Sequence, residues 1–271
     1  MSPLWRDEVA ILIAPRQLVL TRMSRGLRPR CIADLRRTVD DGASLDWRPA
    51  LKVLGDCLSE AAWQEANARI VLANHWARYA VVPWANDIAN EEERLAHARI
   101  CLANIYGNVA EQWRVGLSHA APGDARIACA VEGDLLDELS AVASAHGLRV
   151  VAMQPQLVAS FNGWRHRLED ASGWFVNIDE GALAAARLVD GGWDRVYSAR
   201  IGTDWAVELQ RLRTFGRLAA KHSENGRVFV AAPAWLRKLA NTREVGIEWL
   251  EDGDGDSADD EDLSVLKRLY A

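Results

Sequence analysis

The chain has 271 residues, of which 49% are hydrophobic, and its formal net charge is −6. Eight of its 38 acidic residues lie in one run, 251–262, so the other 30 face 32 basic residues and the body of the chain is nearly neutral. A dedicated nucleic-acid binder is usually more basic, and no stretch reaches the roughly 18 uninterrupted apolar residues of a membrane helix, so we expect neither.

The first half of the chain alternates short apolar runs with helical patterns. A hairpin is predicted at Pro15-Arg16-Gln17, and a second tight connection at Asn74-His75-Trp76, because apolar runs flank both. Strands are predicted over residues 8–14, 18–23, 69–73, 77–83, 112–118, 126–131 and 148–153. Helices are predicted over 46–63 with Asp46 as its cap, from Asn90 to a stop at Gly107, over 133–146 and over 155–168.

The helix that begins at Asn90 has the clearest end signals. Asn90 and Glu93 have the spacing of a capping box, in which each residue satisfies a free N–H group of the first turn. Gly107 follows the last apolar position and is typical of a helix stop.

The second half has a more regular order of elements. Strands over 174–178, 183–189 and 194–199 form a predicted meander, with Asp190-Gly191-Gly192 as a hairpin turn. A helix over 204–220, a strand over 227–231, a helix over 233–239 and a strand over 245–249 follow. The first half repeats this order if the helix at Asn90 is an insertion, which predicts an internally duplicated α/β fold of two lobes, each a mixed sheet with flanking helices.

This order divides the chain into four parts. We expect an extra N-terminal subdomain over 1–65, a first lobe with an inserted helix over 66–172, and a second lobe over 173–250. The rest, 251–271, reads as an acidic, mobile tail in which 263–270 is a possible short docking element.

A duplicated meander with alternating helices and strands resembles the RNase H-like, actin-like ATPase fold of actin, Hsp70 and sugar kinases. Residues 70–84, Ile-Val-Leu-Ala-Asn-His-Trp-Ala-Arg-Tyr-Ala-Val-Val-Pro-Trp, resemble the first hairpin of PilM-like pilus assembly proteins and of the cytoplasmic domain of type II secretion protein L. Residues 174–181, Trp-Phe-Val-Asn-Ile-Asp-Glu-Gly, stand where that fold begins its second half. The resemblance covers about 66–250.

The chain departs from this family at the residues that would bind nucleotide. An active member has an acidic residue and a glycine turn at the first hairpin, where this chain offers Asn74-His75-Trp76. At the second hairpin Asp179 and Gly181 match, but no Ser or Thr follows to contact a phosphate. The adenosine-binding stretch has Ala231-Ala232-Pro233 in place of paired glycines. We therefore expect no cofactor; if magnesium–ATP does bind, Asp179 and Gly181 are the candidate contacts.

An arginine-rich segment near the N-terminus is a candidate interface. Arginine forms bidentate contacts with carboxylates and is common at interfaces. The segment would fit an acidic partner, anionic lipid headgroups or this chain's own acidic run, and solvated strand edges are the alternative. The candidates are Arg22, Arg25, Arg28, Arg30, Arg36 and Arg37.

Metal and thiol chemistry find little support. Glu93, His97 and Cys101 share one helix face at four-residue steps, but no further ligands are evident, so no metal site is predicted. Residues 252–263 lack the glycine and final glutamate of a calcium loop. The four cysteines form no C-x-x-C pair and are expected to be buried thiols in a reducing compartment.

These observations favour a bacterial, cytoplasmic scaffold rather than an enzyme. The N-terminus lacks the pattern of a secretory signal, so we expect a cytoplasmic location. This location includes peripheral attachment to the inner face of the inner membrane. The resemblance implies an adaptor in a type IV pilus or type II secretion apparatus, with an inner-membrane component and the assembly ATPase as partners. One alternative is an actin-like ATPase or phosphotransferase in which Asp179 holds magnesium. Another is a carbohydrate or small-ligand module that uses the twelve tryptophans.

Overall fold

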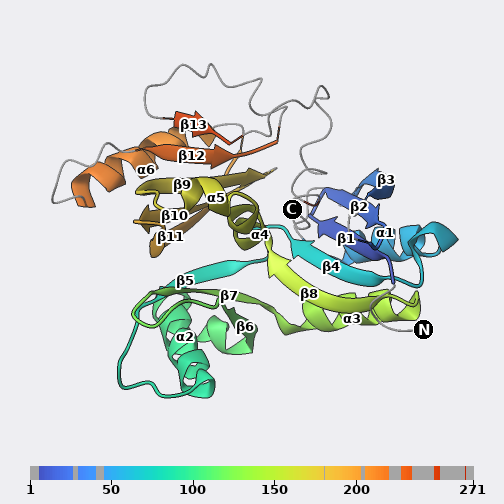
Figure 1. The fold of residues 1–271 in the computed structure, drawn as a ribbon, viewed down its shortest axis with the longest axis horizontal. Helices are drawn as coiled ribbons and strands as arrows, with labels where there is room; N and C mark the ends of the chain where they lie inside the picture. The colour runs from blue at the N-terminus through green and yellow to red at the C-terminus, as the bar shows by residue number, and fades with distance from the viewer. Residues whose placement is uncertain are drawn as a thin grey trace.

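The fold consists of two lobes and a smaller inserted subdomain (Figure 1). It was obtained as a computed structural model, which describes residues 6–26, 30–40, 46–179, 181–202, 205–219, 227–233, 247–250 and 266. Within these residues no helix combines the length and apolar character needed to cross a bilayer. The predicted helix over 233–239 and the acidic run 251–262 lie almost wholly outside the described residues.

The first lobe is built on a five-stranded mixed sheet in the order β3-β2-β1-β4-β8. Its strands are β1 (Glu8–Ile13), β2 (Gln17–Met23), β3 (Cys31–Thr38), β4 (Asn67–Leu72) and β8 (Arg149–Pro155). The strands β1 to β3 run antiparallel, whereas β1, β4 and β8 run parallel. The boundary predicted at residue 65 is therefore wrong, because β1–β3 belong to the same sheet as β4.

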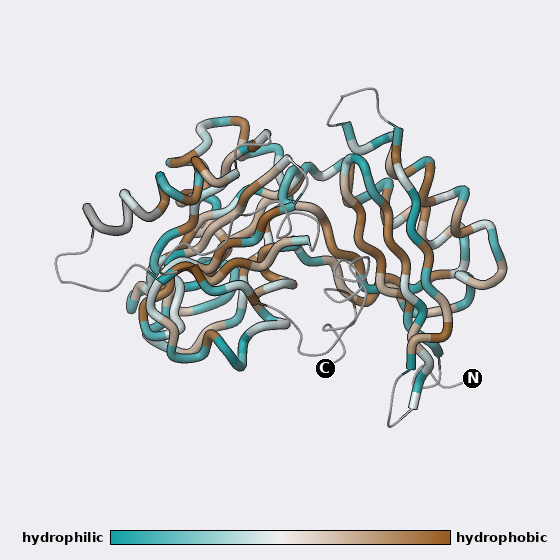
Figure 2. The backbone as a smooth tube through the Cα atoms, turned by 90° about the horizontal axis from the view of Figure 1, so that it is seen from above, coloured by the Kyte–Doolittle hydropathy of each residue, from teal (hydrophilic) through white to brown (hydrophobic). Residues whose placement is uncertain are grey.

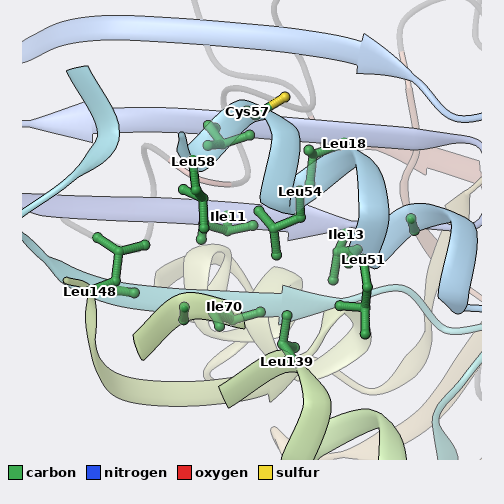
Figure 3. Packing of buried hydrophobic residues seen from close by; sticks show 14 of the residues in the cluster. Ile11, Ile13, Leu18, Leu51, Leu54, Cys57, Leu58, Ile70, Leu139 and Leu148 are labelled. Atoms are coloured by element: carbon green, nitrogen blue, oxygen red, sulfur yellow. The ribbon is translucent and has the colours of Figure 1, made fainter. Parts of the chain in front are cut away.

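Two helices cover one face of this sheet, α1 (Arg48–Leu58) and α3 (Gly133–Ala145). Alternate residues of the central strands, such as Ile11 and Ile70, face Leu54 and Leu139 of these helices (Figure 3). All four side chains are fully buried, which at about 25 cal/mol per Å² of apolar surface makes this layer the main source of the lobe's stability. The helix predicted over 46–63 ends earlier, at Leu58, and its N-cap is Trp47 rather than Asp46.

The second lobe repeats this sheet, in the order β11-β10-β9-β12-β13. Its strands are β9 (Gly173–Asp179), β10 (Ala182–Val189), β11 (Gly192–Arg200), β12 (Val228–Ala231) and β13 (Ile247–Trp249). Its pairing is also antiparallel over β9–β11 and parallel over β9, β12 and β13. The helix α6 (Trp205–Ala219) follows the meander. The predicted turn is confirmed, with φ of +49° at Asp190 and +75° at Gly191, and so is the duplication.

The inserted subdomain has its own three-stranded sheet, β5-β7-β6. Its elements are β5 (Arg78–Val82), α2 (Glu91–Tyr106), a 3-10 turn (Gly107–Gln112), β6 (Trp113–Leu117) and β7 (Arg126–Glu132). Strand β5 pairs with β7, whereas β4 pairs with β1 and β8. Residues 74–76 therefore lead from one sheet into another, and the predicted hairpin at this point is wrong.

The two lobes exchange packing elements. After β8 of the first sheet come α4 (Gln156–Gly163) and α5 (Arg165–Leu168), which Trp164 separates. Phe161 of α4 packs edge-on against Phe175 of β9, with ring centroids 5.7 Å apart. In the other direction, the helical residue Leu266 is fully buried against Leu12 and Val19 of the first sheet. Hydrophobic residues accordingly follow the central strands of both lobes (Figure 2).

Candidate functional site

The candidate site is the junction of the lobes, where β4 and β9 end. The backbone N–H of Ala73 donates to the carbonyl of Ile13 at 3.0 Å, so the carboxyl ends of β4 and β1 share one edge of the first sheet. Asn74 follows directly, and its N–H donates to Oδ2 of Asp179, the last residue of β9, at 3.3 Å. In open α/β sheets ligands bind outside the carboxyl ends of strands, and here those ends are bonded to each other.

The side chain of Asn74 is the centre of a buried polar network. Its Oδ1 accepts hydrogen bonds from the Tyr79 hydroxyl at 2.6 Å and from the Leu157 N–H at 3.1 Å. Its Nδ2 donates to Oδ1 of Asn177 on β9 at 2.6 Å. Burial raises the pKa of Tyr79 well above its ordinary value, so the phenol stays a neutral donor. The amide therefore joins the first lobe, the inserted subdomain, α4 and the second lobe.

His75 fills the space above the second hairpin. Its Nδ1 lies 3.7 Å from Oδ1 of Asp179, and the two side chains are only 3% and 10% exposed. A Cβ atom placed on Gly181 would lie 3.1 Å from Nε2 of His75. Gly181 also has a φ of +85°, which L side chains rarely adopt. A glycine thus suits this position, because it leaves room for the imidazole ring of His75 against the second hairpin.

These residues do not fit magnesium–ATP. A phosphate site needs backbone N–H groups that can turn toward the ligand, but the N–H of Asn74 is engaged by Asp179. The Asp179 carboxylate, which would hold magnesium or its water, lies buried beside His75. Asp179 and Gly181, the candidate contacts for magnesium–ATP, both lie against His75.

Sequence reasoning placed the first hairpin at the wrong residues. The hairpin of the first sheet that corresponds to β9–β10 is β1–β2, whose turn is Ala14-Pro15-Arg16. Pro15 is buried and has no N–H to donate to a phosphate, and the turn contains neither a carboxylate nor a glycine. The signal was available, since the first two predicted strands already formed a hairpin like the one that opens the second lobe.

The residues predicted from the adenosine-binding stretch lie beside the network, because Ala231 pairs with Asn177 between β12 and β9. Ala231 ends β12 and is buried in an apolar cluster that includes Tyr79 and Leu157, whereas Ala232 is buried among residues of the second lobe. They contribute packing and present no polar group.

An open pocket of about 290 Å³ lies beside the network, between the first lobe, the inserted subdomain and the end of β11. Its lining combines three indole rings, three guanidinium groups, two carboxylates and one imidazole. The residues are Asp46, Trp47, Arg48, His75, Trp76, Arg78, Trp113, Glu132 and Arg200. Sequence reasoning missed this pocket, because its residues come from five separate stretches of chain.

Most polar groups of the pocket are held in place by the chain itself. The Trp47 indole N–H donates to Glu132 at 3.2 Å, and the Arg48 guanidinium lies over the Trp47 ring and bonds to Asp46. Arg78 donates to two backbone carbonyls at 2.9 Å each. Arg200, the exposed last residue of β11, brings a further positive charge. Flat rings with fixed cations suit a ligand that has both apolar side chains and carboxylate or carbonyl oxygens.

Two of the predicted interface arginines serve the chain's own packing. Arg22 donates to Asp7 at 3.0 Å and to the Ala62 carbonyl at 2.7 Å, and Arg25 lies 3.3 Å from Glu8. These contacts hold the start of β1 to β2 and to the chain before β4. Arg22 and Arg25 thus have roles within the chain, and their part in an interface stays a prediction.

The other predicted arginines gather at the edge of the first sheet. Arg36 and Arg37 are exposed on β3, and Arg30 is exposed just before it. Arg28 lies outside the described residues.

The predicted metal and thiol candidates have other surroundings. Glu93 closes the capping box of α2, and in the described ranges no three His, Cys, Asp or Glu side chains gather as a metal site requires. Cys57 is buried, Cys101 and Cys129 are half-buried and Cys31 is exposed, so the expectation of buried thiols fails for Cys31. Burial raises the pKa of Cys129 to about 12, which keeps this thiol neutral.

Comparison with known proteins identifies the fold. No protein-family model matches the chain, and no curated protein sequence matches it. The cytoplasmic domain of EpsL, an inner-membrane component of the type II secretion system of Vibrio cholerae, has a TM-score of 0.61 and 11% identity over 98% of this chain and 95% of its own. The PilM–PilN type IV pilus biogenesis complex has a TM-score of 0.69 and 17% identity over 97% of both chains.

A third solved structure agrees with these two. A Bacteroides thetaiotaomicron protein with an actin-like ATPase fold has a TM-score of 0.63 and 11% identity over 97% of this chain and 96% of its own. The chain therefore has the actin-like fold and resembles PilM and the cytoplasmic domain of EpsL in its architecture.

Proposed function

We propose that this chain is a non-catalytic cytoplasmic adaptor of a type IV pilus or type II secretion-like assembly, which binds an inner-membrane component, the assembly ATPase or both. The closed junction carries the proposal: Asn74 bonds to Asp179, and His75 covers the Gly181 turn where an actin-like ATPase would hold phosphates. Two similar structures belong to such assemblies, one as an inner-membrane component and one as a complex of PilM with PilN.

The pocket beside the junction is the surface that we assign to a partner segment. A short peptide can place an apolar side chain between Trp76 and Trp113 and an acidic side chain near Arg48 or Arg200. Three separate parts of the fold contribute to the lining, so binding also depends on how the lobes and the inserted subdomain are arranged.

Nucleotide binding tests the non-catalytic half of the proposal. Calorimetric titration of the full chain with magnesium–ATP, together with thermal unfolding, is expected to give no heat of binding and no change in Tm. Binding with micromolar affinity would stabilise the fold by about 3–4 kcal/mol at millimolar nucleotide, and that result would contradict the proposal. It would favour the ATPase or phosphotransferase alternative, in which Asp179→Asn should abolish the effect.

Site-specific cross-linking tests the adaptor half. A photoreactive benzoylphenylalanine in place of Arg200, at the pocket, is expected to cross-link in the native cell to an inner-membrane pilus or secretion protein. The same residue in place of Arg195 provides the control, because Arg195 is exposed on the same strand but does not line the pocket. Equal products at both positions, or none at Arg200, would count against a partner at this site.

The three indole rings that line the pocket are the observation that favours the alternative of a small-ligand module. A carbohydrate or similar ligand would stack on Trp76 or Trp113 and change their fluorescence. The test is fluorescence titration of the wild type and of Trp113→Leu with a panel of glycans. Saturable binding that Trp113→Leu abolishes would favour the small-ligand module, and no binding is expected of the adaptor.

A further inference from the structure

Strand β3 forms an open edge of the first sheet. It is the last strand in the order β3-β2-β1-β4-β8 and pairs with β2 at seven positions, with Ile32 skipped at a register shift. Among the elements that the structure describes, only β2 makes extensive contact with it. An edge strand leaves the N–H and C=O groups of every second residue directed outward, which is a template for a further strand.

The duplicated fold supplies an internal comparison. Strand β11 has the same place in the second sheet, at the end of the order β11-β10-β9-β12-β13. There the chain itself covers the strand, because β5 of the inserted subdomain lies against β11. Two equivalent strands thus differ in that one already has an extended segment beside it.

The side chains of β3 indicate the chemistry of a partner. Ala33 and Leu35 pack into the core of the first lobe, so the strand is anchored. Ile32 is 55% exposed, which is unusual for a large apolar side chain. Arg36 and Arg37 are exposed farther along the strand, with Asp34 as its single acid. An occupant should therefore offer carboxylates beside the arginines and an apolar side chain beside Ile32.

We propose that β3 binds an extended acidic segment of a protein partner, which adds to the first sheet as a sixth strand. Main-chain hydrogen bonds would supply affinity, and the arginines would select an acidic sequence. A lipid surface could satisfy the arginines but not the row of backbone donors and acceptors, which favours a peptide. This surface goes beyond the proposed function, because it lies apart from the pocket and would give the adaptor a second docking site.

A defined peptide tests the proposal on the full chain. The probe is an octapeptide of alternating valine and glutamate, and binding is followed by fluorescence anisotropy and by amide hydrogen exchange. Slower exchange confined to residues 31–38 and their β2 partners is expected. A matched peptide of valine and lysine should not bind. Protection elsewhere, or no binding of the acidic peptide, would overturn the proposal.

Variants separate charge recognition from strand addition. The double variant Arg36→Glu and Arg37→Glu should weaken binding by about tenfold or more, whereas Arg99→Glu, at an exposed position on α2, should leave it unchanged. Two further peptides carry methyl groups on the amides of either the valines or the glutamates. At least one of them should fail to bind, because one set of amides must face β3. Unchanged binding of both would rule out a backbone-paired strand.

Other occupants give different results. If vesicles containing phosphatidylglycerol bind through the same arginines while the acidic peptide does not, the edge is a membrane contact and the proposal fails. If replacing the eight acidic residues of 251–262 by their amides or serine makes the peptide bind much more tightly, the chain's own acidic run occupies the edge, and the proposal of a partner segment fails as well.

Discussion

At the scale of single residues, Asn74 joins four parts of the molecule. Its side chain and N–H together make four hydrogen bonds, to Tyr79, Leu157, Asn177 and Asp179. An amide is suited to this position because it donates and accepts at once and carries no charge. A carboxylate at the same position would lie close to Asp179, and two buried like charges would repel each other.

We predict that Asn74→Ala strongly destabilises the fold. The substitution leaves the Tyr79 hydroxyl, the Leu157 N–H and the Asn177 carbonyl buried without this partner, and each unsatisfied group costs about 1–3 kcal/mol. A loss of about 3 kcal/mol in the free energy of unfolding is expected in urea denaturation. Asn104→Ala, at an exposed position on α2, should change it by less than about 0.5 kcal/mol. A loss at Asn74 as small as the control's would show that the network is not a structural joint.

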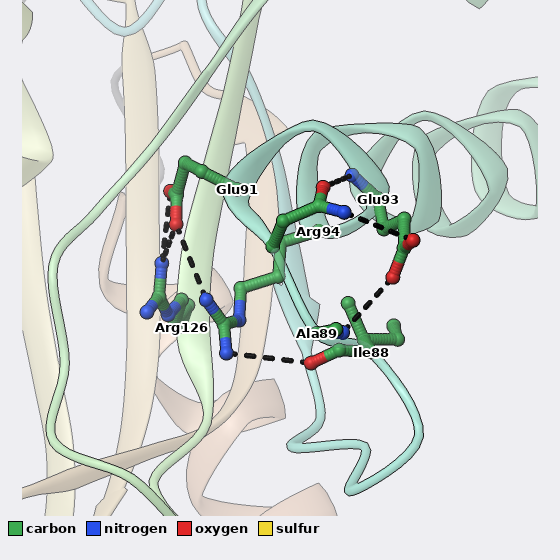
Figure 4. A network of polar contacts seen from close by, with 7 residues as sticks. Ile88, Ala89, Glu91, Glu93, Arg94 and Arg126 are labelled. Carbon is green, nitrogen blue, oxygen red and sulfur yellow. Dashed lines mark hydrogen bonds and ion pairs between the residues drawn. The ribbon is translucent and has the colours of Figure 1, made fainter.

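At the scale of elements, α2 is fixed to the inserted subdomain by its first turn. Oδ1 of Asn90 accepts from the Glu93 N–H at 2.9 Å, and the Glu93 carboxylate accepts from the Ala89 N–H at 2.9 Å (Figure 4). In the same turn Glu91 binds Arg126 of β7 and Arg94. The capping box predicted from the sequence is confirmed, with the variation that the carboxylate reaches the residue before the cap.

Asn90→Ala should lower the free energy of unfolding by about 1 kcal/mol, because the Glu93 N–H loses its acceptor. Faster amide exchange is expected in the first turn of α2, measured beside urea denaturation. Glu92→Ala is the matched control, since Glu92 is an exposed acid of the same turn and contributes only a few tenths of a kcal/mol through the helix dipole. Equal effects of the two substitutions would mean that charge, rather than the cap, stabilises this end.

Elements with local signals could be predicted from the sequence, whereas those defined by distant partners could not. The helix at Asn90 and the turn at Asp190 carry their own cap and turn residues. Strand β3, Cys-Ile-Ala-Asp-Leu-Arg-Arg-Thr, was missed because an exposed edge has no alternating apolar pattern. Strand β5 was assigned to the wrong sheet, because its pairing with β7 depends on residues more than 40 positions away.

The candidate site shows the same division. The second hairpin, which contains Asp179 and Gly181, could be located because it is local in sequence. Asp179 and Asn74 are 105 positions apart in the sequence, and no pattern in either segment predicts their contact. The pocket likewise forms only when five separate stretches of the chain have come together.

At the scale of the whole molecule, the exchanged packing elements hold the lobes together. Leu266 is far along the chain from the first sheet, yet it packs in one apolar cluster, here called the Leu266 cluster, with Ala10, Leu12, Val19, Val71 and Ala159. The possible docking element predicted over 263–270 thus includes at least one residue that docks on its own chain.

Leu266→Ala should cost about 2–5 kcal/mol, as expected for a fully buried leucine. Binding of a dye specific for exposed apolar surface should rise, because the other residues of the Leu266 cluster become more exposed. Val207→Ala on α6, where the side chain is 54% exposed, is the control and should have little effect. A loss below about 1 kcal/mol in the free energy of unfolding would show that the rest of the Leu266 cluster can repack without the leucine.

The packing of Leu266 on the first sheet also determines when the first lobe can complete its folding during synthesis. Its last strand, β8, ends at Pro155, but Leu266 is among the residues that pack on the face of β1 and β2 turned away from α1. At about 5–20 residues per second the ribosome needs roughly 5–20 s to make the intervening chain. For that interval the nascent first lobe lacks Leu266 against Leu12 and Val19, so both side chains are more accessible to a chaperone that binds short apolar strands.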